Sequence, residues 1–272
     1  MQENRNLPDL NRMSILVALI CLLYALTPYI QFSTGPLDFN LGGIRFTYRI
    51  SFVTLVSLLA AALAVSGANW IFMSHPGKRA RQLIPHWLLP GLTAWAISIP
   101  LSSLDVGVAW WIAFGFGSFL LLLVILFEYI VIDLSDIQYP FAAIGLSAVA
   151  FILFLILIIS VQSAELRLYL KLPIVIVPLA LITLRVLYLR TNGIWMPEWA
   201  FCIAILIGEI TAALHYLPIR PISFGIILSG SAYALSSLAS AYHDDPGDQR
   251  IWIEPGLVML MTFLIFIINP GF

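Results

Sequence analysis

The sequence has little charge, and this scarcity narrows the class of protein. Charged residues make up 10% of the 272 residues and apolar residues 61%, and the net charge is -1. Soluble domains average about 25% charged and about 45–50% apolar residues, so an ordinary soluble fold is excluded. Nucleic-acid binding is excluded too, because no basic patch is large enough to replace the counterions of a phosphate backbone.

Reactive and metal-binding motifs are also scarce. Both cysteines, Cys21 and Cys202, lie in apolar runs with no second thiol or histidine at ligand spacing, which argues against a disulfide framework and a zinc site. The sequence contains no H-E-x-x-H, P-loop, G-x-S-x-G or glycine-rich dinucleotide motif. We therefore expect no cofactor.

Long apolar runs take the place of charge. A helix needs about 20 apolar residues to cross a bilayer core of about 30 Å, and in hydrocarbon the backbone must satisfy its own hydrogen bonds. The runs are continuous instead of alternating, which favours helices over a barrel. We predict an all-α polytopic membrane protein, a single domain over residues 1–272, with about nine transmembrane helices, or eight if the third or the last does not cross. The predicted spans lie near residues 13–30, 50–73, 83–102, 107–132, 138–161, 172–190, 197–217, 221–242 and 251–268.

A short segment between the first two spans has a different pattern. In "LDFNLGGIRFTY", residues 37–48, apolar residues alternate on both sides of Gly42 and Gly43. This pattern is typical of two strands joined by a two-residue turn. We predict a small β-hairpin lying on one membrane face.

The basic residues of the short loops indicate an orientation. Lys78, Arg79 and Arg81 lie between the second and third spans, and basic loops stay on the cytoplasmic side. This assignment places the N-terminus in the cytoplasm, although Arg45 and Arg49 on the opposite side reduce the charge difference.

The stretch "IGEITAALHYLP", residues 207–218, places Glu209 near the middle of a span. An intramembrane carboxylate is costly unless it is neutralised or paired, so Glu209 marks a candidate polar site. Two explanations are open: a protonated Glu209 hydrogen-bonded to Ser229 or Ser231 of the next span, or a proton, ion or headgroup site. His215 lies about 240° further around the helix, so we interpret it as an interfacial residue and not as a relay partner.

A second candidate is a buried ion pair. Glu128 lies five residues before Asp133 and Arg185 five residues before Arg190, at the ends of the fourth and sixth predicted spans, and the threading puts both ends on the same membrane face. Such a pair more often orients helices than performs chemistry.

The loop "HDDPGDQR" supports one enzymatic alternative. Asp244, Asp245 and Asp248 have the D-D-x-x-D spacing that resembles membrane prenyltransferases, and Mg²⁺ is held by a few carboxylates plus substrate phosphates. Asp133 and Asp136 lie on the same predicted face. The longer signature of that family is missing, and Pro-Gly inside the loop also makes an ordinary turn.

Four strings together resemble an uncharacterised family of bacterial multi-pass membrane proteins, known only as a domain of unknown function. They are "GANWIFMSHP" at 67–76, "HWLLPGLTAWA" at 86–96, "FEYIVID" at 127–133 and "ALHYLPIRPISFG" at 213–225. The resemblance implies a shared helical fold and a bacterial inner membrane, and it implies no activity.

Three functional interpretations follow. The first is a non-catalytic structural or accessory membrane component, with the lipid bilayer and other membrane proteins as partners. The second is a transporter of a small molecule, ion or lipid with a polar site around Glu209. The third is a Mg²⁺-dependent lipid-diphosphate transferase that uses Asp244, Asp245 and Asp248.

Overall fold

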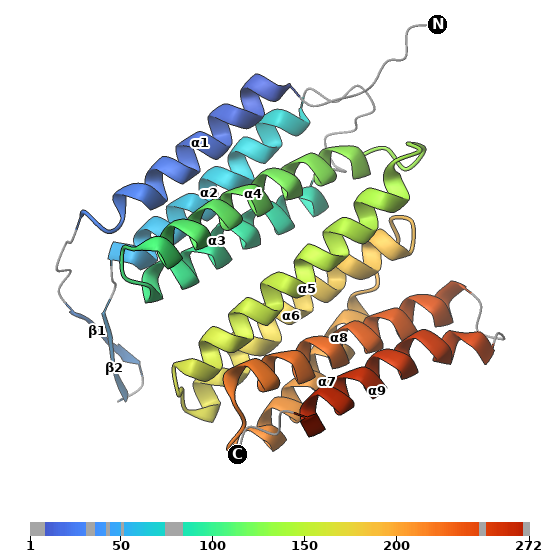
Figure 1. Ribbon diagram of the computed structural model, residues 1–272. Helices are drawn as coiled ribbons and strands as arrows, with labels where there is room; N and C mark the ends of the chain where they lie inside the picture. The colour runs from blue at the N-terminus through green and yellow to red at the C-terminus, as the bar shows by residue number, and fades with distance from the viewer. Residues whose placement is uncertain are drawn as a thin grey trace, which may run out of the picture. The chain divides into compact units, whose positions relative to one another are not determined.

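The computed structural model describes residues 9–30, 36–41, 44–49, 52–73, 84–244 and 249–268 (Figure 1). Helices dominate these residues, as the composition predicts. The chain divides into two compact units, Met1–Ile132 and Asp133–Phe272. The single membrane domain stays a prediction, and each unit is a helical assembly in its own right.

The first unit contains four α-helices among its described residues. The second helix packs against the first and the third, and the fourth packs against the third and the first, so the four form a bundle. The elements are α1 (Leu10–Leu26), β1 (Pro36–Leu41), β2 (Ile44–Arg49), α2 (Phe52–Phe72), the 3-10 helix η2 (Ile84–Trp87), α3 (Leu88–Ser103) and α4 (Val108–Val131).

Strands β1 and β2 lie between the first two helices. They pair antiparallel, with a register that runs from Pro36 opposite Arg49 to Leu41 opposite Ile44. The predicted hairpin falls on this segment, and its turn at residues 42–43 lies outside the described residues.

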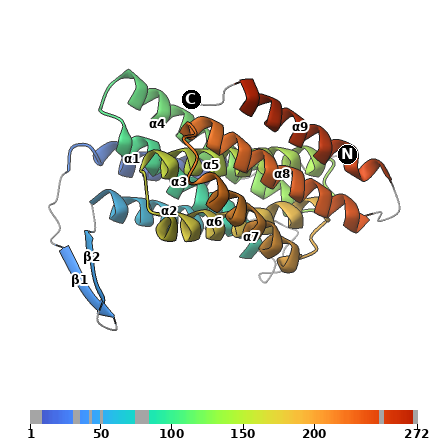
Figure 2. The same ribbon diagram turned by 90° about the horizontal axis from the view of Figure 1, so that it is seen from below.

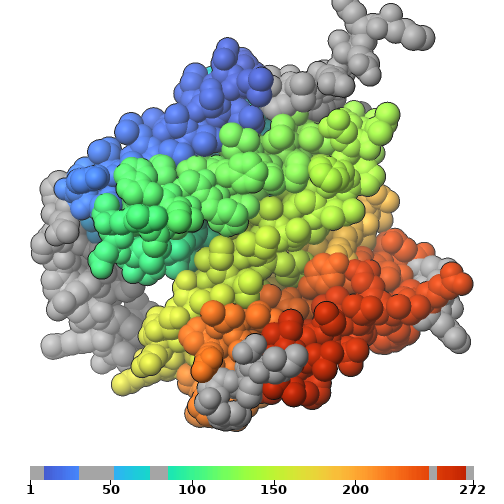
Figure 3. Space-filling model, in the orientation of Figure 1, coloured from blue at the N-terminus to red at the C-terminus, as the bar shows by residue number. Residues whose placement is uncertain are grey.

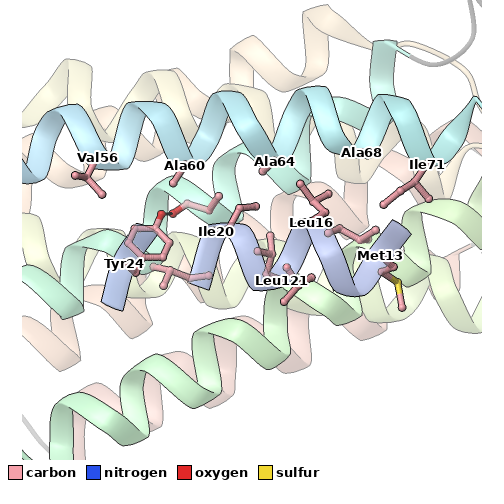
Figure 4. Packing of buried hydrophobic residues seen from close by; sticks show 14 of the residues in the cluster. Met13, Leu16, Ile20, Tyr24, Val56, Ala60, Ala64, Ala68, Ile71 and Leu121 are labelled. Atoms are coloured by element: carbon pink, nitrogen blue, oxygen red, sulfur yellow. Dashed lines mark hydrogen bonds between the residues drawn. The ribbon is translucent and has the colours of Figure 1, made fainter. Parts of the chain in front are cut away.

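Small side chains bring α1 and α2 together. Ala60, Ala64 and Ala68 recur every four residues on one face of α2, are fully buried, and face Leu16 and Ile20 of α1 (Figure 4). Small residues at such seams let two helices approach closely in a membrane, where packing and not water drives association.

The second unit contains five α-helices among its described residues. The first, α5, packs against α6 and α8, and α6 also packs against α7 (Figures 1 and 2). The last helix, α9, runs along α8, and both lie on the face seen in Figure 3. Pro140, Pro197 and Pro221 stand at the first turns of α5, α7 and α8, where a missing N–H costs nothing. The elements are α5 (Tyr139–Ser163), α6 (Leu168–Arg190), α7 (Pro197–Leu214), α8 (Pro221–Asp244), the 3-10 helix η3 (Gln249–Trp252) and α9 (Ile253–Ile268).

Seven helices in the described part of the chain are long and apolar enough to cross a membrane. They comprise Phe52–Phe72, Val108–Val131, Tyr139–Ser163, Leu168–Arg190, Pro197–Leu214, Pro221–Asp244 and Arg250–Ile267. The shorter α1 and α3 have 17 and 16 residues, and 16 residues extend only about 24 Å. The helical class is confirmed for the described residues, these helices are consistent with a polytopic membrane protein, and the count of nine spans stays a prediction.

The seam between α1 and α2 gives a first prediction. Ala64→Phe should lower the free energy of unfolding in detergent by about 1–3 kcal/mol, because a ring at a fully buried position must displace α1. The matched control is Ala62→Phe, two residues away on the exposed side of α2. Equal stability of the two variants would show that the seam is not closely packed.

Candidate functional site

A cavity of about 570 Å³ opens among α5, α6, α8 and α9 of the second unit. Three of these helices meet there by their ends, because α5 and α9 begin and α6 ends at the cavity. Its lining combines polar groups with a larger apolar part. The lining residues are Tyr139, Pro140, Ala143, Ile144, Ser147, Ala148, Leu189, Arg190, Asn192, Tyr233, Ser240 and Glu254.

Tyr233 of α8 is the central residue of this cavity. Its hydroxyl donates a hydrogen bond of 2.7 Å to Oε1 of Glu254 on α9. The guanidinium of Arg190, on α6, lies 4.8 Å from the centre of the Tyr233 ring. The same ring meets Phe151 of α5 edge to face, with 5.4 Å between the ring centres. One side chain thus connects the four helices that surround the cavity.

The end of α6 fixes the place of Arg190. Asn192 adopts a left-handed conformation with φ 52°, Gly193 follows with φ 90°, and the Gly193 N–H donates to the carbonyl of Tyr188 at 2.9 Å. This is the Schellman arrangement that ends a helix, and a cation in the last turn is favoured by the helix dipole. The Leu189 carbonyl accepts a 3.0 Å hydrogen bond from the Tyr139 hydroxyl, which ties α6 to the start of α5.

The two poles of the cavity carry opposite charge without pairing directly. Within the described residues, no carboxylate lies at ion-pair distance from Arg190. Glu254 is exposed, and the Tyr233 hydroxyl occupies one of its oxygens. A carboxylate can accept several hydrogen bonds and a guanidinium can donate several, so both groups retain capacity for a ligand.

The remaining wall of the cavity is apolar and open. Pro140, Ile144 and Ala148 follow one another at helical spacing on α5, line the cavity and are exposed. Ile144 is 71% exposed. Because this side faces outwards from the second unit, a chain in the surrounding hydrocarbon has access to the cavity.

A second polar centre of this unit is closed. The ammonium of Lys171 on α6 is 2.7 Å from Oε1 of Gln162, near the end of α5, and 3.0 Å from Nδ1 of His215, just after α7. Phe224 of α8 offers its ring face at 5.4 Å. Lys171 is only 2% exposed, so this cluster joins four helices and leaves little room for a ligand.

The first unit holds a buried acid and a histidine in contact. His86 Nδ1, in η2, is 2.7 Å from Glu128 Oε2, on α4, and their side chains are 5% and 0% exposed. Phe72 of α2 meets the imidazole edge to face at 6.2 Å. The pair therefore connects η2 to α4 beside α2, and the sequence pattern alone does not indicate His86 as a partner of Glu128.

The predicted partner of Glu128 belongs to the other unit. Arg185 is 1% exposed on α6 and lies 5.2 Å from the ring centre of Tyr188, three residues along the same helix. A pair between Glu128 and Arg185 would join the two units, and it stays a prediction.

Glu209 is exposed on α7. A side chain at Gly208 would come within 2.7 Å of Ile176, so α7 packs against α6 at this small residue, and the neighbouring Glu209 is exposed. The Ser229 hydroxyl is buried without a hydrogen-bond partner among the described residues. Ser231, 5% exposed, lines a groove between α8 and α9. The structure does not bring Glu209 to the Ser229 hydroxyl, and a role for Glu209 stays a prediction.

Two of the acidic candidates, Asp133 and Asp136, lie in the short turn segment before α5. Asp133 Oδ1 accepts hydrogen bonds from the backbone N–H and the hydroxyl of Ser135, and Asp136 Oδ1 accepts one from the backbone N–H of Gln138. Asp244 is the last residue of α8, while Asp245 and Asp248 lie outside the described residues. In the part of the chain that is described, no three metal-binding side chains cluster.

The sequence held signals for the residues that were missed. Gln162, Lys171 and His215 are polar residues near the ends of successive apolar runs, and ends on the same face can meet. Tyr233 could not be singled out, because an aromatic residue in an apolar run is ordinary.

Comparisons with known proteins identify the family. The sequence matches the family described as Protein of unknown function (DUF5656) over residues 32–269, and the chain belongs to this family. The search of curated proteins finds no match. The search of solved structures finds none either.

The buried pair of the first unit predicts energetic coupling. His86→Ala and Glu128→Ala should each destabilise the protein, and the double variant should lose less than the sum, with a coupling of about 0.5–3 kcal/mol. Unfolding in detergent measures all three. Additive losses would mean that the 2.7 Å contact contributes no stability.

The closed cluster of the second unit predicts a loss of stability for Lys171→Met. A methionine fills the same space but leaves the half-buried Gln162 and His215 without the ammonium, at a cost of about 1–3 kcal/mol for the lost hydrogen bonds of a charged group. Arg167→Met, one turn away on the exposed surface, is the control. A stability equal to that of the control would contradict the assignment.

Proposed function

We propose that this member of the DUF5656 family is a non-catalytic, accessory membrane component that binds an amphiphilic ligand in the cavity of its second unit. The observation that carries the proposal is the lining of the cavity. Arg190, Glu254 and the Tyr139 hydroxyl stand where helices begin or end, and apolar side chains of α5 extend from there. An amphiphile has the same division between a polar head and an apolar chain.

The position of the cavity along the helices supports a lipid. Arg190 is the last residue of α6, and Tyr139 and Glu254 lie in the first turns of α5 and α9. In a spanning helix, terminal residues lie near the headgroups and the interior lies in hydrocarbon. A lipid could therefore occupy the cavity without leaving its leaflet.

The arrangement of the polar groups favours binding over transport. Tyr233 is held by contacts from α5, α6 and α9, and the Lys171 cluster near the other ends of α5 and α6 is closed by its own partners. A ligand held at one end of the second unit is consistent with a lipid-binding accessory role. Transport around Glu209 and diphosphate chemistry at Asp244, Asp245 and Asp248 remain alternatives.

The proposal includes a location and partners. We place the protein in a bacterial inner membrane with nine spans and a cytoplasmic N-terminus, because the basic loop at Lys78 to Arg81 favours that side. By the alternation of spans, the cavity then lies at the cytoplasmic face. Other membrane proteins are proposed as partners.

Filling the cavity tests the proposed function. Ala148→Trp should abolish the co-purification of a bound lipid, because the indole occupies the apolar wall of the cavity. Ala213→Trp, an exposed alanine of α7 outside this lining, is the matched control. Native mass spectrometry of the protein released from detergent counts the bound lipids. Equal lipid retention in both variants would show that the cavity is not the binding site.

A further inference from the structure

We propose that the cavity of the second unit recognises a phospholipid whose headgroup carries both an anionic phosphate and a primary ammonium group, as phosphatidylethanolamine does. This inference rests on the proposed function, because it names the class of amphiphile that the same cavity takes. Arg190 is assigned to the phosphate and Glu254 to the ammonium.

The cavity carries one charge of each sign. Its lining contains one basic residue, Arg190, and one acidic residue, Glu254, and the other residues are neutral. A ligand with a single negative charge would pair with the guanidinium of Arg190. The carboxylate of Glu254 would then face that ligand, which is itself a hydrogen-bond acceptor. A headgroup with one charge of each sign complements both.

The two charges are placed around one tyrosine. The Arg190 guanidinium lies 4.8 Å from the centre of the Tyr233 ring, and Glu254 accepts a hydrogen bond from the hydroxyl of the same residue, so Tyr233 contacts both charged side chains. The two side chains do not form an ion pair in the described structure. The phosphate and ammonium of ethanolamine phospholipids are joined by a two-carbon link, so one headgroup can contact two charged side chains that meet at the same tyrosine.

The two charged side chains differ in the hydrogen bonds that they can form with a headgroup. A guanidinium forms paired, charge-assisted hydrogen bonds with phosphate oxygens. A primary ammonium can donate hydrogen bonds to the free acceptor sites of Glu254, whereas the quaternary ammonium of phosphatidylcholine has no N–H to donate. The site should therefore prefer a primary ammonium to a quaternary one.

The apolar wall of the cavity offers a route for acyl chains. Pro140, Ile144 and Ala148 form an exposed apolar wall that leads away from the polar groups along α5. A soluble phosphate or phosphoethanolamine would leave this wall uncovered. A membrane lipid would cover it, and we assign the ligand to the membrane for this reason.

The experiment titrates the full-length protein in detergent with three lipids of identical short acyl chains. These are phosphatidylethanolamine, phosphatidylcholine and phosphatidylglycerol, and native mass spectrometry measures each affinity. The wild type should bind phosphatidylethanolamine about tenfold more tightly than either of the others, as expected for one charge-assisted hydrogen bond.

Two variants assign the two charges. Glu254→Gln should weaken phosphatidylethanolamine binding to the level of phosphatidylcholine and leave phosphatidylglycerol binding unchanged. Arg190→Gln should weaken all three lipids by about tenfold, because each has a phosphate. Two variants serve as controls. Glu198→Gln changes an acid at the second position of α7, which matches the position of Glu254 in α9. Arg220→Gln changes an exposed arginine.

The outcomes separate this inference from the proposed function. Equal affinity of the wild type for the three lipids would overturn the headgroup assignment and leave amphiphile binding intact. Failure to bind any lipid above the Ala148→Trp background would overturn both. Equally tight binding of free phosphoethanolamine or inorganic phosphate would overturn the membrane source. If Arg190→Gln does not fold, the lipid preference of the wild type and its loss in Glu254→Gln still decide the question.

Discussion

Hydrocarbon offers no water to a polar group, and this constraint governs both units. Backbone groups are satisfied within helices, and buried polar side chains must find partners in the protein or be exposed at helix ends. His86 meets Glu128 in the first unit, and Lys171 meets Gln162 and His215 in the second. Each contact joins separate elements of the chain. Because a buried polar group without a partner is unfavourable, these contacts favour the one arrangement of helices that supplies the partner.

Small residues decide which helices can make such contacts. Without a hydrophobic force between apolar helices, close packing depends on shape. The alanines of α2 bring α1 near, Gly208 brings α7 against α6, and Gly225 admits Leu155 and Ile159 of α5 to the surface of α8. The rotation of each helix follows from these contacts. It also determines which polar side chains face inwards and which, such as Glu209, face outwards.

Polar groups at the two ends of the second unit are accommodated in different ways. The Lys171 cluster is sealed by partners from neighbouring helices, with the cation over Phe224. At the other end, Arg190 and Glu254 are held by Tyr233 but not neutralised by each other, and an apolar wall of α5 lies beside them. The sealed end accounts for stability. The open end retains binding capacity, and it is there that the structure carries a functional hypothesis.

The sequence by itself determined the membrane class and the approximate limits of most helices. Those properties are local, because apolar length and the prolines at first turns act within one segment. It also pointed to Glu128 as a buried acid and supported membership of the family. Only the tertiary structure decided the partners. That His86 contacts Glu128, that Glu209 is exposed, and that Tyr233 joins four helices all depend on which helices are neighbours and how each is rotated. Rotation is set by packing between residues far apart in the chain, and hydropathy along one segment contains no record of it.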